Sequence, residues 1–134
     1  VIQIKDIDFY KKKYKIPDDM MMVLASPTTF RDEYRVVVYN NLGFTACQYK
    51  HRGRMNIEAI QERKENEILE WANSVVLPRV DIKSPAFVLD VGVIEESDRK
   101  VSDEFAVVEL NSFSSSGFYK CNIDKIVKEL INEH

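Results

Sequence analysis

The sequence predicts an α+β fold: a mostly antiparallel β-sheet with a long helix and a C-terminal helix packed on one face. Two observations support this prediction. Residues 33–39, 44–49, 87–93 and 105–111 are rich in β-branched and aromatic residues with polar residues at alternate positions, which is typical of strands. Residues 56–76 and 123–131 instead repeat apolar side chains at a helical period.

The chain before the first strand contains three short elements. A short helix is predicted to open at Asp6, and its basic run 11–15 is interpreted as a solvated helix face. A turn at 17–19 precedes the apolar run 20–25, which has the length of a strand. Pro27 ends or bends that run, because a residue before proline is held extended.

The first two strong strands are predicted to form a hairpin. Strand 33–39 is followed by Asn40-Asn41-Leu42-Gly43, in which Asn and Gly can adopt positive φ, and strand 44–49 returns beside it. Along the first strand, Glu33 and Arg35 share one face. The hairpin leads into the basic cluster 50–54, which could hold a phosphate or form an ordinary loop.

Both long helical stretches have a capping residue. Asn56 is predicted to cap the helix over 56–76, and Trp71 is expected to anchor that helix in the core. Asn122 is predicted to cap the C-terminal helix, whose apolar stripe should pack on the back of the sheet.

Polar residues interrupt the last two strands, which we expect to pair as an antiparallel hairpin. Asp90 should share a face with its neighbours two positions away, and Glu109 should point the same way as Asn111, with Val107 on that face too. Two carboxylates and an amide oxygen would then converge. Hard oxygen ligands of this kind suit Mg²⁺, although solvated strand residues on an open face would give the same pattern.

Composition limits the class of protein. The 134 residues are one domain's worth of chain, and a net charge of −3 argues against nucleic acid as a partner. No apolar run has the length of a membrane span, so no membrane partner is expected. The two cysteines form no CxxC pattern, and Cys47 is interpreted as a small core residue. This favours a reducing, cytoplasmic location.

The order of these parts resembles the C-terminal lobe of the ATP-grasp fold, from about residue 20 to the end of the chain. Segment 107–112 is similar to that family's Glu-x-Asn strand, and 89–91 is similar to its Asp strand. Segment 33–38 resembles the Arg-bearing strand, and 48–50 resembles the end of the strand that follows.

The resemblance implies an ATP-dependent carboxylate–amine ligase reaction. In that reaction a carboxylate attacks the γ-phosphate, and an amine displaces the resulting acyl phosphate. The resemblance makes Arg35 a catalytic contact to the transferring phosphate, and it implies ATP with Mg²⁺ or Mn²⁺. The metal ligands would be Asp90, Glu109 and Asn111; the nucleotide or phosphate contacts would be Lys50, Arg52 and the adenine hinge Val23, Leu24 and Ala25.

The chain departs from the family pattern before the hinge-like segment. Only about twenty residues precede it, whereas the family places a nucleotide-clamping lobe there. Residues 1–134 are therefore expected to form a single domain that lacks this lobe, as a fragment or a truncated relative. Its partners would be ATP, an unknown carboxylate and amine, and either the missing lobe or another protein. Removing Asp90 or Glu109 is expected to abolish metal-dependent nucleotide binding with little loss of fold.

Two other functions fit parts of the pattern. Metal-dependent nucleases carry Asp on one strand and Glu-x-Lys on the next, but Asn111 occupies the lysine position and the chain is acidic overall. A non-catalytic interaction or inhibitor protein on the same scaffold would explain the missing lobe. The three converging polar residues argue against that alternative.

Overall fold

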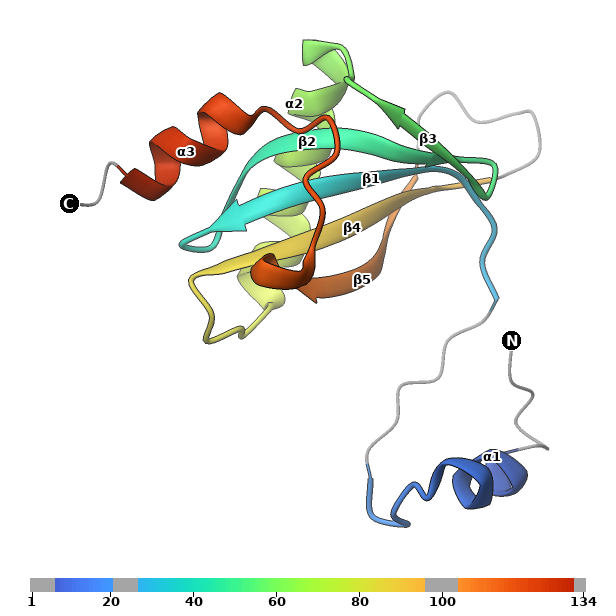
Figure 1. Cartoon of the computed structure of the whole chain (residues 1–134). Helices are drawn as coiled ribbons and strands as arrows, with labels where there is room; N and C mark the ends of the chain where they lie inside the picture. Colours follow the sequence, from blue (N-terminus) through green and yellow to red (C-terminus); the bar gives the residue numbers. More distant parts are fainter. Residues whose placement is uncertain (1–6, 21–26, 96–103, 132–134) are drawn as a thin grey trace.

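A five-stranded antiparallel sheet forms the centre of the molecule, in the order β3-β2-β1-β4-β5 (Figure 1). The computed structural model describes residues 7–20, 27–95 and 104–131. The α+β class predicted from the sequence is confirmed. The strands are β1 (Phe30–Tyr39), β2 (Leu42–His51), β3 (Arg54–Glu58), β4 (Ala86–Ile94) and β5 (Phe105–Ser112).

Three α-helices accompany the sheet. They are α1 (Ile7–Tyr14), α2 (Glu62–Trp71) and α3 (Ile123–Ile131). Helix α2 continues without a break into a π-helical turn, η2 (Ala72–Val76), and then a 3₁₀ turn, η3 (Leu77–Arg79). Pro78 lies within η3, where its missing N–H ends the helical hydrogen bonding.

The two long helices lie on opposite faces of the sheet. Tyr34, Val36 and Val38 of β1 pack with Ile68 and other residues of α2 in the larger core. The alternate residue Val37 instead packs with residues that include Ile126 of α3. In Figure 1, α2 passes behind the sheet while the segment leading to α3 crosses in front. The expectation that the C-terminal helix covers the back of the sheet, behind the polar cluster, is therefore wrong.

Two tight turns set the register of the first three strands. Asn40 and Asn41 have φ values of 47° and 61°, and Arg52 and Gly53 have 45° and 74°. Each pair forms a two-residue connection with positive φ at both positions, which matches the twist of a hairpin. The second turn reverses the chain into β3. Residues 54–58 are therefore an edge strand, not the start of the long helix.

The predicted cap of the long helix is wrong for the same reason. Asn56 lies in β3, and α2 begins at Glu62 after the extended residue Gln61. Trp71 does pack against the core as predicted, and its ring lies 5.6 Å from that of Phe105. At the C-terminal helix the prediction is confirmed, because Asn122 Oδ1 accepts a hydrogen bond from the Lys125 backbone N–H at 3.0 Å.

Side chains from the long helix protect part of the β2 edge. Strand β3 pairs with β2 only from Gln48 to His51. Beyond that point, Asn73 bonds both the N–H and the carbonyl of Gly43, at 2.8 and 3.0 Å. Glu65 accepts from the Ala46 N–H at 2.9 Å. These contacts satisfy backbone groups that an exposed edge strand would offer to another chain.

Candidate functional site

Arg35 and Asp90 form a bidentate ion pair across the β1–β4 seam. They are register partners in the sheet, and Arg35 Nε and Nη2 lie 2.9 and 2.7 Å from the two oxygens of Asp90. Asp90 is fully buried and Arg35 is 6% exposed. Both side chains project on the face opposite α2, as the alternation of the strands predicts. Paired donors matched to both carboxylate oxygens are the strong form of this contact.

The Arg35 guanidinium is also held from the side by a loop and two rings. Nη1 donates to the Gly117 carbonyl at 2.8 Å. The guanidinium carbon lies 5.2 Å from the centre of the Tyr49 ring and 4.9 Å from that of Tyr119. These rings are stacked, with centroids 5.8 Å apart. The hydrogen bond to Asp90 raises the pKa of Arg35, so the group stays charged despite its burial.

Strand β5 brings Glu109 and Asn111 to this pair. Glu109 is the register partner of Asp90, and Asn111 Nδ2 donates to Asp90 at 3.3 Å. Burial raises the pKa of Asp90, the Arg35 hydrogen bond and charge oppose that shift, and Glu109 adds to it by repulsion. Three N–H donors converge on the two Asp90 oxygens, an arrangement suited to a carboxylate. Glu109 itself is exposed.

A bulge in β5 determines which residues join the cluster. Asp90 pairs with Glu109, but the next residue, Val91, pairs with Val107, so Val108 is an extra residue. Cross-strand partners share a face, and Val91 belongs to the core beneath α2. Val107 therefore lies on the opposite face from Glu109, and the expectation that they share a face is wrong. Bulges often re-aim side chains beside functional sites.

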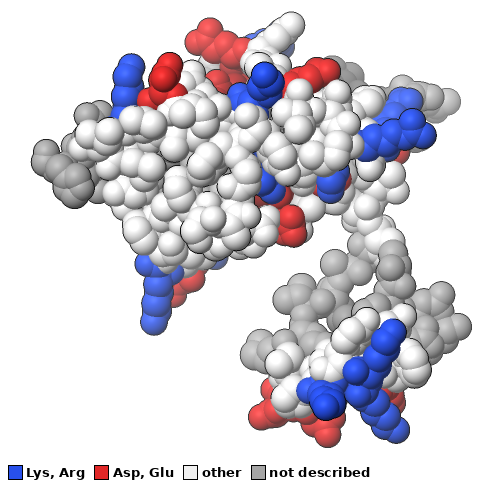
Figure 2. Space-filling view, in the orientation of Figure 1, with Lys and Arg blue, Asp and Glu red and all other residues white. Residues whose placement is uncertain are grey.

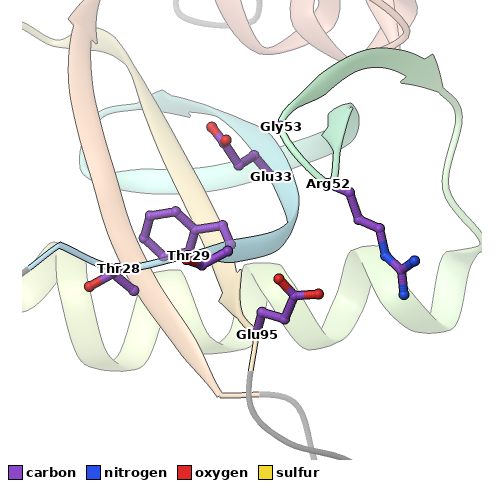
Figure 3. A pocket seen from close by; sticks show the side chains of 7 residues that line it. Thr28, Thr29, Glu33, Arg52, Gly53 and Glu95 are labelled. Carbon is purple, nitrogen blue, oxygen red and sulfur yellow. The ribbon is translucent and has the colours of Figure 1, made fainter.

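A cavity of about 500 Å³ opens where β1 begins, and Glu33 connects it to the ion pair. Glu33 lies two residues before Arg35 on the same face of β1. Its Oε2 accepts from the Tyr49 hydroxyl at 2.5 Å and from Lys50 Nζ at 3.1 Å. Figure 3 shows the remaining lining from the start of β1, the β2–β3 turn and the end of β4. The lining residues are Thr28, Thr29, Phe30, Glu33, Arg52, Gly53 and Glu95.

The predicted phosphate contacts are divided by the structure. Arg52 lines the cavity, whereas Lys50 contacts Glu33 and lies 5.1 Å from the Tyr49 ring centre. His51, from the same basic cluster, pairs with Asp32 at 2.6 Å. The predicted hinge residues Val23, Leu24 and Ala25 lie outside the described residues. Figure 2 shows acidic and basic side chains interspersed on the visible face, with no single basic patch.

Three residues of the site were not proposed as functional from the sequence. Glu33 had a usable signal, because alternation places it on the face of Arg35. Tyr49 and Tyr119 had none, since their stacking depends on a loop that folds back over the sheet. Tyr119 has a φ of 49°, which is uncommon outside glycine and turns its ring toward Arg35 and Tyr49.

The donor set partly fits a hard divalent cation. Glu109 offers an exposed carboxylate, and an amide that donates through Nδ2, as Asn111 does, can still offer its carbonyl oxygen. Asp90 uses both oxygens on Arg35, so it fits a cation only if Arg35 moves away. Among residues 7–20, 27–95 and 104–131 there is no group of three or more His, Cys, Asp or Glu side chains placed to hold a metal. One or two carboxylates with phosphate oxygens would be enough for Mg²⁺.

Comparisons with known proteins identify the family. No curated protein and no solved structure matches the chain. No helix among the described residues is both long and apolar enough to cross a membrane. A family model does match, over residues 4–128, and it describes an ATP-grasp domain, the second family of its clade. This match spans nearly all of the sequence and includes every strand of the sheet, so the chain belongs to this family of ATP-grasp domains.

Proposed function

We propose that this ATP-grasp domain binds ATP together with Mg²⁺ or Mn²⁺ and serves a carboxylate–amine ligase reaction. One observation carries the proposal: Arg35, Asp90, Glu109 and Asn111 converge from three adjacent strands on one face of the sheet. The cavity at the start of β1 adjoins this cluster through Glu33. Carboxylates, an amide oxygen and a fixed guanidinium are the groups that phosphoryl transfer requires.

In this proposal Glu109 and Asn111 hold the metal, which would neutralise phosphate charge when bound. Glu109 is suited to this role because its carboxylate is exposed and lies at the register position beside Asp90. Arg35 would contact the transferring phosphate, because its planar fork binds phosphate as well as it binds a carboxylate. Arg52 and Lys50 would supply further positive charge near the cavity. Residues 23–25 would contact the adenine, a role that rests on the resemblance alone.

Asp90 and Arg35 would work by exchanging partners. In the described state each neutralises the other, so neither charge is available to a ligand. A nucleotide with its metal brings both signs of charge together. The phosphate could take the guanidinium while the cation takes the carboxylate, and neither buried charge would be left unpaired. This exchange would couple nucleotide binding to metal binding.

A non-catalytic interaction protein on the same scaffold is the second candidate. It is favoured by the satisfied state of the ion pair: Arg35 bonds to Asp90 and Gly117, and Asp90 is fully buried. A pair of that kind can be wholly structural. The two candidates differ in whether the cluster responds to nucleotide and metal.

Thermal unfolding of the chain with Mg²⁺ alone, ADP alone and both together tests the proposal. A ligand at about a hundred times its Kd should stabilise the fold by roughly 2.7 kcal/mol, and the largest shift should require both ligands. Glu109→Gln should remove the Mg²⁺-dependent part of that shift. Glu129→Gln, an exposed carboxylate on α3, is the matched control and should retain it. No shift with any combination would favour the interaction protein.

A further inference from the structure

The two cysteines of the chain meet beside Arg35 although they lie far apart in sequence. Cys47 of β2 is the register partner of Arg35, and Cys121 immediately precedes the cap of α3. Their sulfur atoms are 2.6 Å apart, and both thiols are free and buried. A covalent S–S bond is about 2.05 Å long, so a small approach would join them. Cys121 Sγ also lies 3.6 Å from the Arg35 carbonyl oxygen.

The segment that ends at Cys121 also supplies two of the groups that hold Arg35. We call residues 113–121 the strap, because this stretch crosses the face of the sheet between β5 and α3 (Figure 1). Gly117 accepts from the guanidinium, and Tyr119 stacks against Tyr49 beside it. Two phenylalanines of the strap, Phe113 and Phe118, pack with Cys47 and Cys121 in the smaller core. The position of the strap and the contacts of Arg35 are therefore linked.

We propose that Cys47 and Cys121 are a reversible dithiol–disulfide pair whose oxidation ties the strap to β2 and fixes Gly117 and Tyr119 against Arg35. The pair has the location such a device needs. One cysteine lies in the sheet interior, the other ends the strap, and the Arg35 main chain contacts the second sulfur. This inference goes beyond the proposed nucleotide binding and does not depend on it.

A hydroperoxide is the oxidant class that fits two buried thiols, because the molecule is small. The Cys47 thiolate attacks one oxygen of H₂O₂, the O–O bond breaks, and Cys47 sulfenic acid and hydroxide form; the hydroxide takes up a proton to become water. The Cys121 sulfur then attacks the sulfenic sulfur. The S–S bond forms, the S–O bond breaks, and a second water leaves. Each thiol loses one hydrogen, and the peroxide is reduced by two electrons.

The surroundings favour Cys47 as the attacking sulfur. The hydrogen bond with Cys121 lowers the pKa of Cys47, and backbone N–H groups of the strap and the positive charge of Arg35 act in the same direction, against burial. The same hydrogen bond and burial raise the pKa of Cys121. A thiolate hydrogen-bonded by a neighbouring thiol has both its nucleophile and its resolving partner in place.

Treatment of the folded wild-type chain with H₂O₂, without nucleotide, tests the pair. After quenching, unfolding and alkylation, mass spectrometry should show the loss of two hydrogen atoms and one cross-linked peptide containing both cysteines. Dithiothreitol should restore two alkylatable thiols. The oxidised chain should unfold at a temperature roughly 10 °C higher, because the bond closes a long loop. Amides of the strap should exchange hydrogen more slowly than in the reduced chain.

Several outcomes would overturn the proposal. Two free thiols after treatment, sulfinic acid on either cysteine, or a disulfide between two copies of the chain would each contradict an intramolecular pair. Cys121→Ser removes the resolving thiol and should let Cys47 proceed to sulfinic acid, whereas Cys47→Ser should leave Cys121 unoxidised. If either variant fails to fold, peptide mapping of the wild-type chain still decides the question. Failure of nucleotide binding would not affect any of these results.

Discussion

Arg35 and Asp90, 55 residues apart in the sequence, meet as direct register partners and neutralise one another inside the sheet. The pair joins β1 to β4, and β4 in turn holds Glu109 through the β4–β5 register. A buried pair of this kind gains little over apolar residues when intact, but it is costly to break. Its two members therefore cannot be treated as independent site residues.

Asp90→Ala should destabilise the fold by about 3–5 kcal/mol, because it leaves the Arg35 guanidinium buried without a counter-charge. Urea unfolding of the variant measures this loss. The double variant Arg35→Leu/Asp90→Leu should lose less than the sum of the two single changes. Strict additivity would mean that the side chains do not interact. This replaces the expectation that removing Asp90 spares the fold, and it leaves Glu109 as the cleaner probe of a metal role.

Gly92→Ala should destabilise the protein by about 1–3 kcal/mol through overpacking. A Cβ at Gly92 would overlap the ring of Phe30, which covers that position at the mouth of the cavity. Thermal unfolding measures the loss. Phe30→Leu in the Gly92→Ala background should recover part of it by removing the ring. A double variant less stable than Gly92→Ala would show that the ring is not the obstacle.

Glu65→Gln should destabilise the protein by about 2 kcal/mol at neutral pH, and the difference should disappear in acid. Burial raises the pKa of Glu65, but bonds from the Ala46 N–H, Thr45 Oγ1 and Lys125 outweigh it, so the folded pKa lies below the ordinary value of 4.5. A depressed carboxyl pKa contributes stability above the unfolded pKa, and this is lost as pH falls through the folded pKa. Urea unfolding of both proteins across this pH range measures the difference. A constant difference at all pH values would contradict the role of the charge.

Asn73→Ala should cost about 2 kcal/mol, because it leaves the N–H and carbonyl of Gly43 without their side-chain partner at the edge of β2. Asn66→Ala changes an exposed residue of α2 and is the matched control, expected to be close to neutral. Urea unfolding compares the two. Size-exclusion chromatography adds a second readout, since an uncovered edge promotes pairing between chains. Equal stability of the two variants would exclude this capping role.

The four long strands were predictable because each is buried enough to need a run of β-branched and aromatic residues. β3 was missed because it is a mostly exposed edge strand, and Ile57 and Ile60 fit a helical period as well as a strand. The signal that could have found it is Arg52-Gly53, a two-residue turn between two short runs.

Convergence of Asp90 and Glu109 followed from alternation along each strand and from antiparallel pairing. The bulge at Val108 did not, because an extra residue changes the face of every residue on one side of it while leaving the composition unchanged. The contacts of Gly117 and Tyr119 were also out of reach, since they depend on which face of the sheet the strap crosses. Local sequence has no signal for that choice.

The strand order has a consequence for how the molecule folds. Strands β1, β2 and β3 are joined by two-residue turns, and β4 pairs with β5, so each group can form from neighbours in the chain. The β1–β4 seam must instead close a loop that contains all of α2. Loop closure slows such pairing, so the seam is expected to form last on the folding pathway. Substitutions at Arg35 or Asp90 should then mainly accelerate unfolding, whereas substitutions in the β1–β2 turn should mainly slow folding.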